Sequence, residues 1–403
     1  MNLSARPNIL LVVFDSLSAQ DLAKHAGDLP TISALLGKSL TFTNAYASSP
    51  EGGPARASLF TGLDMAAHGV WTDGVALPKR ERPLPEVFRE NGYHSWLVGR
   101  RQLAGVSHWT TEHARLLEYD HFDWAHGPLH RSRQNAYLKC LQKTAPEAYA
   151  QIFPQQANPD DTVIPDWQRD AMAGLPDDLG FNTWVGHQVC NRIDDTPFFG
   201  VAGFVVGQSM GSSGAPTEVL NPRALAQADA ALGAILQNLP DNTVVALTAG
   251  RGSVTHPANP LKESAIKIPL ALRVPNRAAE TADKAVSTLD VAPTLYALAQ
   301  LRPPHRIQGQ CLITSERRGW ALCRLRHPDQ PHQTALIARR WKLVMTHGAA
   351  QTLQLFDLEA DPAEANDLSE DHDNQGKVEH MLDQMIDSRV ALEDRTEPRI
   401  AKF

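Results

Sequence analysis

The stretch Asn8-Ile-Leu-Leu-Val-Val-Phe14, which is followed by Asp15, decides the fold of this chain. Every residue between Asn8 and Asp15 is apolar, and three of them are β-branched. An unbroken apolar run of this length predicts a strand buried on both faces, which is typical of parallel sheets covered by helices on both sides. The first strand therefore indicates an α/β protein with a central sheet.

The rest of the chain alternates between short apolar stretches and longer amphipathic ones. Strands are predicted at residues 41–46, 94–98, 198–206, 243–248 and 268–274. Helices are predicted at residues 30–38, 84–90, 182–193, 223–239 and 291–299. This alternation predicts the fold class: an α/β sandwich around a mostly parallel sheet, with helices on both faces.

The pattern changes near residue 315. We assign residues 1–315 to a core domain and residues 316–403 to a small C-terminal α+β subdomain. Within the core, residues from about 105 to 180 contain clustered His, Trp and Pro and are interpreted as a less regular insertion over one end of the sheet.

In the C-terminal subdomain, two antiparallel strands are predicted, at residues 335–345 and 353–358. The acidic run at 357–373 is interpreted as a solvated connection. A final amphipathic helix is predicted at residues 377–392.

Composition excludes several classes of partner. The 403 residues include 38 Lys and Arg against 45 Asp and Glu, a net charge of −7, which argues against nucleic acid or an anionic membrane as the partner of the whole surface. No apolar stretch is long enough to span a bilayer, and the first apolar run is too short for a signal peptide, so we expect a cytoplasmic protein. The four cysteines are far apart, which favours reduced thiols over disulfides or a zinc site.

Several stretches occur together in the order and spacing of one known family. They are Arg6-Pro-Asn-Ile-Leu-Leu-Val-Val-Phe-Asp15, Gly52-Gly-Pro-Ala-Arg-Ala-Ser-Leu-Phe-Thr-Gly62, Leu97-Val-Gly-Arg-Arg-Gln-Leu103, Glu263-Ser-Ala-Ile-Lys-Ile-Pro269, Leu289-Asp-Val-Ala-Pro-Thr-Leu295 and Leu355-Phe-Asp-Leu-Glu-Ala-Asp-Pro362. On these motifs the chain resembles the sulfatase branch of the alkaline-phosphatase superfamily.

The resemblance implies a particular catalytic apparatus. Members of the family oxidise the Cys or Ser of a C/S-x-P-x-R motif to formylglycine, whose hydrate attacks sulfur beside a divalent cation. A gap-free alignment of residues 44–62 places Gly52 at the position of that Cys or Ser, while Pro54 and Arg56 are retained. Glycine has no side chain to oxidise, so the resemblance predicts that the nucleophile is missing.

The metal-binding motifs are altered as well. Asp15 is retained but is followed by Ser16, and the family's T-S-D-H-G motif is replaced by Thr248-Ala-Gly-Arg-Gly252. Gly250 thus stands where the aspartate is expected, and Arg251 follows it. A hard divalent cation prefers several oxygen ligands, and one carboxylate remains, so we expect neither a metal nor any other cofactor.

The groups that would carry protons are also changed. Arg100 and Gln102 replace the Lys and His of the family's K-W-H motif, and Gln208 follows a strand that normally leads to a histidine. Arg keeps its charge but does not release a proton, and Gln is neither acid nor base. The lysine expected after the altered metal loop falls near Ala258, with Lys262 as an alternative.

Two interpretations of the remaining arginines are open. In the first, guanidinium groups take the place of the cation and form a basic pocket for sulfate, phosphate or a sulfonate. In the second, which the cost of an uncompensated buried charge favours, they neutralise leftover carboxylates and fill space. The candidate ligand-binding residues are Asp15, Ser16, Arg56, Arg100, Gln208 and Arg251.

Three functions are therefore considered. The first is an inactive sulfatase-like pseudoenzyme that acts as a binding or scaffold subunit, in a homo-oligomer or with an active paralogue. The second is an active hydrolase of sulfuric or phosphoric esters with an unorthodox metal-free centre, and the third is a different enzyme that uses the same cleft. Five histidines in the insertion fit no metal-ligand motif and are expected to be structural or exposed. They are His108, His113, His121, His126 and His130.

Overall fold

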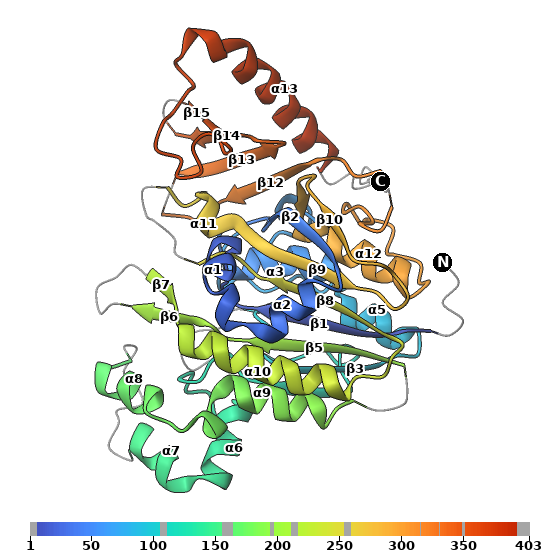
Figure 1. Cartoon of the computed structure of the whole chain (residues 1–403), viewed down its shortest axis with the longest axis vertical. Helices are drawn as coiled ribbons and strands as arrows, with labels where there is room; N and C mark the ends of the chain where they lie inside the picture. Colours follow the sequence, from blue (N-terminus) through green and yellow to red (C-terminus); the bar gives the residue numbers. More distant parts are fainter. Residues whose placement is uncertain are drawn as a thin grey trace, which may run out of the picture.

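The computed structural model describes residues 6–104, 111–154, 164–193, 197–210, 217–253, 259–314, 316–329, 331–348 and 351–392. A central sheet runs through the core, and a second sheet packs beside it under the C-terminal helix (Figure 1). Within the described residues, no helix is long and apolar enough to cross a membrane.

The central sheet has nine strands in the order β10-β2-β9-β8-β1-β5-β3-β4, with β11 paired to β2. Pairing is parallel except along both edges of β9, so the predicted mostly parallel sheet is confirmed. The strands are β1 (Asn8–Phe14), β2 (Leu40–Tyr46), β3 (His94–Gly99), β4 (His121–Trp124), β5 (Phe198–Phe204), β8 (Thr243–Ala249), β9 (Lys267–Arg273), β10 (Glu280–Ala282) and β11 (Val286–Ser287). All of β1 is buried because both of its neighbours, β5 and β8, are themselves covered by helices.

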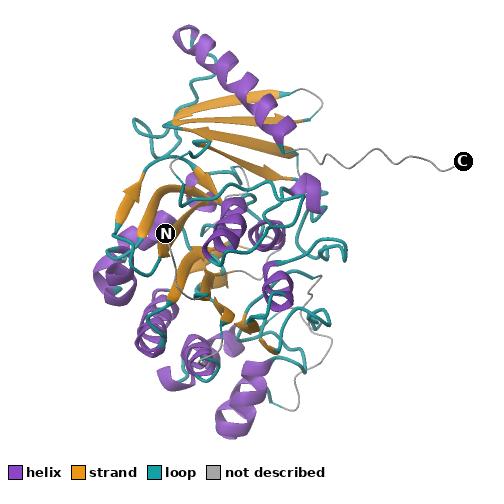
Figure 2. Ribbon diagram, turned by 90° about the vertical axis from the view of Figure 1, so that its right-hand side faces the viewer, coloured by secondary structure: helices purple, strands orange, loops and turns teal. Residues whose placement is uncertain are grey.

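Helices cover both faces of this sheet (Figure 2). On one face α2 (Pro30–Leu36), α9 (Phe181–Cys190) and α10 (Pro222–Asn238) pack together. On the other lie α3 (Gly52–Thr61), α5 (Leu84–Glu90) and α12 (Val291–Leu298). The shorter helical segments are α1 (Ala19–Lys24), η1 (Ala26–Asp28), α4 (Met65–His68), α11 (Glu263–Ile266) and η3 (Thr288–Asp290).

The region predicted as an insertion contributes β4 and several helices beyond it. These are α6 (Ala136–Thr144), α7 (Pro146–Ile152), α8 (Asp166–Ala173) and η2 (Asp177–Leu179), and α6, α7 and α8 lie together in Figure 1. A separate hairpin of β6 (Gly207–Met210) and β7 (Thr217–Leu220) follows β5. The described part of the insertion is therefore more helical than its composition indicated.

The C-terminal sheet is antiparallel, in the order β12-β13-β14-β15. Its strands are β12 (Trp320–Leu325), β13 (His332–Ala338), β14 (Trp341–His347) and β15 (Thr352–Asp357), followed by η4 (His372–Asn374) and α13 (Gln375–Ala391). The single strand predicted at 335–345 is wrong, because the chain reverses at Arg339 and Arg340 and forms a tight hairpin there. Residue 315, at the predicted domain boundary, lies outside the described residues.

A buried charge cluster joins the C-terminal sheet to the core. Lys342 of β14 is fully buried and binds the Glu364 carboxylate, and the other oxygen of Glu364 accepts a hydrogen bond from the Glu263 backbone at 2.7 Å. Asp357 is also buried and pairs with Arg340. The interpretation of the acidic run 357–373 as wholly solvated is thus wrong at two of its carboxylates.

Candidate functional site

The candidate site lies at the carboxyl edge of the parallel strands. Asp15 follows β1, Gly250 follows β8, Arg100 follows β3 and Val206 follows β5. Because β3, β5, β1 and β8 are parallel neighbours, their carboxyl ends meet at one edge, which is where ligands bind in open α/β sheets. The contacts described below bring Asp15, Arg56 and Arg100 together at this edge.

Asp15 is the anchor of the site. Its carboxylate is 3% exposed and accepts hydrogen bonds from the backbone amides of Val206 at 2.8 Å and Gly207 at 3.4 Å. Its other oxygen pairs with an Arg100 guanidinium nitrogen at 3.1 Å. The negative charge that would hold a cation in an intact sulfatase is here committed to protein donors.

Arg56 is the most unusual side chain in the site. It projects from α3, is 1% exposed and donates one hydrogen bond, to the Gln102 side-chain oxygen. Its Nε and second terminal nitrogen have no hydrogen-bond partner within the part of the chain that the structure describes. Such buried unsatisfied donors are costly unless something else binds them.

The electrostatics around Arg56 show an excess of positive charge. Burial lowers the pKa of Arg56 to about 9, and the neighbouring charges of Arg100 and Arg251 act in the same direction. Asp15 and Asp73 oppose this effect but do not cancel it. Burial is thus the largest cause of the lowered pKa, and the two neighbouring arginines add to it.

Gly52 begins α3, and the space above it is filled. A Cβ atom at this position would lie 2.7 Å from the side-chain nitrogen of Gln102 and 2.8 Å from its oxygen. Gln102 adopts a backbone φ of +62°, which costs a non-glycine residue energy. The amide of Gln102 thus occupies the volume into which a nucleophilic side chain would project.

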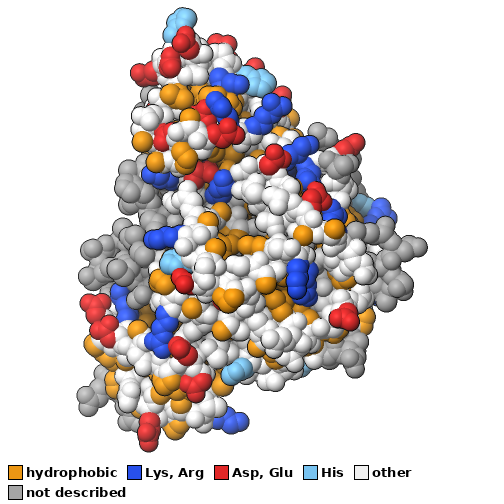
Figure 3. Space-filling model, in the orientation of Figure 1, with side chains coloured by type: hydrophobic (Ala, Val, Ile, Leu, Met, Phe, Trp, Pro, Cys, Tyr) orange, Lys and Arg blue, Asp and Glu red, His pale blue; other side chains and the backbone are white. Residues whose placement is uncertain are grey.

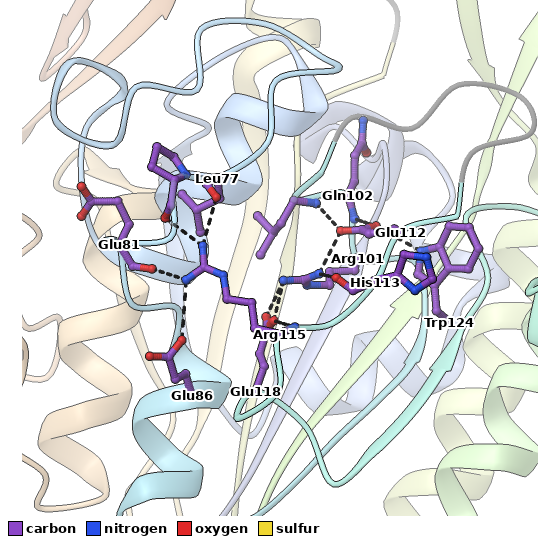
Figure 4. A network of polar contacts seen from close by, with 12 residues as sticks. Leu77, Glu81, Glu86, Arg101, Gln102, Glu112, His113, Arg115, Glu118 and Trp124 are labelled. Carbon is purple, nitrogen blue, oxygen red and sulfur yellow. Dashed lines mark hydrogen bonds and ion pairs between the residues drawn. The ribbon is translucent and has the colours of Figure 1, made fainter.

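The position of Gln102 is imposed by a polar network from the insertion, shown in Figure 4. Glu112 is 1% exposed and accepts hydrogen bonds from the backbone amides of Gln102 at 2.9 Å and Leu103 at 2.7 Å, and from the Trp124 ring at 3.0 Å. Arg101 bridges Glu112 to Glu118, which it contacts at 2.6 Å and 2.7 Å. Four side chains therefore hold the turn that directs Gln102 over Gly52.

The second altered position, Gly250, faces the same arginine. A Cβ atom there would lie 3.2 Å from Nε and 3.4 Å from Cζ of Arg56. Any longer side chain at residue 250 would meet the guanidinium group. Among the described residues, no three His, Cys, Asp or Glu side chains come together as a metal site requires. One carboxylate bound to an arginine does not fit a divalent cation, which wants several oxygen ligands.

Two acidic residues that the sequence reasoning missed complete the site. Asp73 accepts a hydrogen bond from the Gly53 amide at 2.5 Å, near the start of α3, and another from the Gln102 side chain at 3.1 Å. Glu51, just before α3, has a carboxylate oxygen that is buried without a hydrogen-bond partner among the described residues. Burial and the nearby Asp73 charge raise the pKa of Glu51 to about 7. Neither residue belongs to a motif that marks it in the sequence.

The other predicted residues are placed as follows. Arg251 is half-buried, and its carbonyl accepts a hydrogen bond from Leu17 at 3.0 Å, which fastens the loop after β8 to the one after β1. The Ser16 hydroxyl is buried without a hydrogen-bond partner within the described residues. Gln208 lies on β6, but its side chain, like residue Ala258, lies outside the described part of the chain.

Among the insertion histidines, His126 and His130 approach each other, with ring centroids 5.0 Å apart. His108 lies outside the described residues. The pair borders a cavity of about 830 Å³ that adjoins the site, since Arg100 and Gly207 also line it. Most of its wall is apolar and includes Leu129, Met172 and Phe181.

Comparison with known proteins agrees with this geometry. The family model "Sulfatase" matches residues 7–164, and the model "N-sulphoglucosamine sulphohydrolase, C-terminal" matches residues 259–391. The fold and site thus define a sulfatase-type α/β hydrolase architecture. The chain belongs to the sulfatase family, within the alkaline-phosphatase superfamily.

Relatives and solved structures cover almost the whole chain. An uncharacterised sulfatase of Escherichia coli, YidJ, is 22% identical over 91% of this chain and 84% of its own length. Arylsulfatase K of Mus musculus is 22% identical over 97% of this chain and 80% of its own length. The crystal structure of a phosphonate monoester hydrolase of Agrobacterium radiobacter superposes with a TM-score of 0.74, 18% identity and 96% coverage of both chains. At that identity the structural likeness confirms the fold alone.

Proposed function

We propose that this chain is a catalytically inactive member of the sulfatase family that binds a small tetrahedral anion at the former catalytic centre. The observation that carries the proposal is that protein side chains fill two positions of that centre. The Gln102 amide stands where a nucleophile at residue 52 would project, and the Arg56 guanidinium stands where a ligand at residue 250 would project. Loss of the nucleophile alone leaves room for water or another group at residue 52. Here side chains fill the space at residues 52 and 250, and the nearby space that remains is the cavity lined by Arg100.

Anion binding is supported by guanidinium nitrogens that have no hydrogen-bond partner among the described residues. Arg56 presents two unpartnered nitrogens, and Nε of Arg100 is likewise buried without a hydrogen-bond partner in the described chain. Guanidinium groups bind sulfate and phosphate through paired, charge-assisted hydrogen bonds. Arg100 lines the adjoining cavity of about 830 Å³, where an anion would have space beside its guanidinium group, so sulfate, phosphate and sulfonates are the ligands with the right chemistry.

The first test measures binding by thermal stability. Sulfate, phosphate or methanesulfonate is added at fixed ionic strength against chloride, and unfolding is followed. Saturation at about 100 times Kd stabilises the fold by about 2.7 kcal/mol. We expect Arg56→Met to abolish this increment, while Lys143→Ala, on an exposed surface of α6, leaves it intact. An equal increment in the wild type and in Arg56→Met would refute the anion site.

The second test concerns catalysis. Purified protein is assayed with aryl sulfates, phosphate diesters and phosphonate monoesters, and we expect no turnover above that of an Arg100→Ala control. Turnover that disappears in Arg100→Ala would instead establish the metal-free hydrolase. A change in a substrate outside these ester classes would establish the third function, a different enzyme using the cleft.

A protein that binds an anion without converting it can act only through another protein that responds to the bound state. We propose that this partner is a second copy of the chain or an active paralogue, and that the bound anion acts as the signal. Light scattering of the purified protein and co-purification with a paralogue that carries an intact C-x-P-x-R motif test this role. A monomer that captures neither would leave the anion site as a storage or buffering site and would refute the scaffold role.

A further inference from the structure

The C-terminal helix α13 carries large apolar side chains on two sides. On one side, Met381 and Met385 are buried in the core of the C-terminal subdomain. On another, Ile386 and Val390 are 49% and 54% exposed. Within the described ranges, five large apolar side chains are exposed in this way, and these two are the pair that shares a helix. Exposed apolar side chains that lie together mark a surface that contacts another molecule.

Ile386 and Val390 end a stripe that follows the helix. Residues four apart lie on the same side of a helix, one turn along. The stripe, which we call the apolar stripe, consists of Val378, Leu382, Ile386 and Val390. Val378 and Leu382 are half-buried and pack against the core of the subdomain, whereas the last two face solvent. The apolar stripe therefore begins in the protein's own core and ends on its surface.

A row of acidic residues follows one edge of the apolar stripe. Each occupies the position after a stripe residue, about 100° further around the helix. The row consists of Glu379, Asp383 and Asp387, all exposed and without an ion pair to any described residue. More acidic side chains gather at the top of the subdomain in Figure 3, where α13 begins. Like charges four residues apart destabilise a helix, so this row is unfavourable in a single copy.

Positive side chains lie together at the opposite edge. Arg389 occupies the position before Val390 and therefore lies on the side of the stripe that faces the C-terminal sheet. The group, which we call the basic cluster, consists of Arg326, His332, His347 and Arg389. Burial and then the charges of the other three lower the pKa of His347, and no carboxylate is among the charges that act on it. Neither arginine forms an ion pair with a described residue, although Arg326 stacks on the Trp71 ring at 4.7 Å.

The apolar stripe thus has acidic residues along one edge and the basic cluster at the other. Such a surface is complementary to a second copy of itself, as a two-fold interface requires. If the two helices run in the same direction about a two-fold axis parallel to them, the acidic row of each copy faces the basic cluster of the other. If they run in opposite directions, acidic row faces acidic row and the charges repel.

We propose that two copies of the chain form a dimer through the apolar stripe of α13, with the two helices parallel and Asp387 of each copy beside Arg389 of the other. This interface gives a surface to the self-association proposed above and rests on that proposal only for the choice of a second copy as partner. It does not depend on the anion, since no residue of α13 lines the cavity beside Arg100. Association is therefore measured without sulfate or phosphate, and Arg56→Met should associate as the wild type does.

The first test is analytical ultracentrifugation of the full chain. A contact centred on one helix is at the small end of stable interfaces, so we expect a dimer with a Kd on the order of 10 µM. The double variant Ile386→Ser, Val390→Ser should raise this Kd by about 10-fold or more, because it removes the apolar centre of the contact. A wild type that stays monomeric at 10 times that concentration would overturn the proposal.

The chain provides a matched control for this variant. Leu116 and Leu117 are the other adjacent pair of exposed apolar side chains in the described part of the chain. Leu116→Ser, Leu117→Ser removes a similar apolar area at a different place and should leave the Kd within about 2-fold of the wild type. Equal losses in the two double variants would show non-specific association and no interface on α13.

Charge reversal tests the pairing between the copies. Asp387→Arg and Arg389→Asp should each raise the Kd by about 5-fold or more, and the two together should restore it. Residues two apart on a helix do not face each other, so restoration cannot come from a contact within one copy. A combined variant as weak as the single ones would contradict the contact between Asp387 and Arg389.

Cross-linking tests the direction of the helices. In the parallel dimer residue 390 of one copy lies beside residue 390 of the other, so Val390→Cys should form a disulfide-linked dimer under mild oxidation. In an antiparallel dimer residue 390 lies opposite residue 382 instead. The wild type controls for the native cysteines, and Glu147→Cys, on the exposed surface of α7, controls for chance collisions. A dimer that persists in the ultracentrifuge without cross-linking at residue 390 would overturn the parallel arrangement.

Discussion

Arg100 and Arg101 are neighbours in the chain, yet their side chains enter two very different environments. Arg101 is 3% exposed, and its two terminal nitrogens are bound by the carboxylates of Glu112 and Glu118 (Figure 4). Only its Nε lacks a partner in the described chain. Arg100 lies near Arg56, where the guanidinium groups of Arg56, Arg100 and Arg251 are opposed by the carboxylates of Asp15 and Asp73.

This difference in bonding indicates that the Arg101 cluster and the arginines of the cleft have different roles. In the Arg101 cluster two acidic groups meet one basic group, and the hydrogen bonds offset most of the cost of burying charge. The acid Glu118 has a raised pKa because burial outweighs the opposing charge of Arg101. In the cleft, two of the three guanidinium nitrogens of Arg56 have no hydrogen-bond partner among the described residues. One cluster stabilises the fold and positions Gln102, and the other is the proposed anion site.

The largest expected effect tests the structural cluster. Arg101→Met should destabilise the protein by about 3–5 kcal/mol, because it leaves Glu112 and Glu118 buried without their counter-charge. Urea unfolding followed by circular dichroism measures the change. A triple variant that also carries Glu112→Gln and Glu118→Gln should recover part of the loss, since the unpaired charges are then gone.

Arg100→Met is the matched comparison. Its side chain is 13% exposed, and Asp15 keeps the amides of Val206 and Gly207 as donors, so the expected loss is about 1–2 kcal/mol. Losses of equal size at residues 100 and 101 would show that both arginines serve the same structural purpose, and the distinction between the two clusters would fail.

The second prediction concerns the filled space above Gly52. Gly52→Ala should cost about 1–2 kcal/mol, because the new Cβ would displace the flexible end of Gln102 and break its hydrogen bonds to Arg56 and Asp73. In a Gln102→Ala background the same change should be neutral or stabilising by up to about 1 kcal/mol, since alanine suits a helix better than glycine. A double-mutant cycle by urea unfolding measures the coupling. Additive effects would mean that Gln102 does not occupy the position.

The extent to which the sequence predicts this molecule differs between the backbone and the site. The apolar run from Ile9 to Phe14 has a single physical outcome, because a segment with no polar side chain must be covered on both faces. The register that places Gly52 at the nucleophile position rests on local spacing to Pro54 and Arg56. Both are short-range properties. The strand is present in the structure, and Gly52 begins α3, while its assignment as the nucleophile position stays a prediction.

The contacts that define the site join residues that are far apart in the sequence, so no local sequence pattern predicts them. Gln102 lies over Gly52 only because Glu112, in the insertion, binds the turn at residues 102 and 103. The turn at Arg339 was missed for a related reason, since it lacks the Gly, Asn or Asp that marks such turns. Glu364 looks solvated in an acidic run, and only the fold brings Lys342 against it.

The third prediction is a pH dependence at the edge of the cleft. The pKa of Glu51 is raised to about 7 in the fold, so the folded state holds a proton that the unfolded chain has released. The contribution of Glu51 to stability should therefore fall as pH rises from about 5 to about 8, by on the order of 1–2 kcal/mol after allowance for partial solvent exposure, whereas buried His68, whose pKa is lowered to about 3, contributes in the opposite direction.

Relative to the wild type, Glu51→Gln should make the change in stability between pH 5 and pH 8 more positive by this amount, while Glu147→Gln, at an exposed position on α7, should leave that change as it is in the wild type. Urea unfolding at pH 5 and pH 8 measures the difference. The same change in Glu51→Gln as in the wild type would leave the Glu51 carboxylate ionised in the fold.

The smallest expected change in stability is the most informative one. Arg56→Met removes a fully buried cation that makes one hydrogen bond, to Gln102, and replaces it with an apolar chain of similar length. Since the protein leaves most of its donors unsatisfied, the free energy of unfolding should change by less than about 1 kcal/mol or increase. Urea unfolding without and with sulfate separates the two roles: the variant should match the wild type without sulfate and fall below it with sulfate. A loss of several kcal/mol without any anion would place Arg56 with Arg101 as a structural group, and the cleft would then have no vacant donors to offer a ligand.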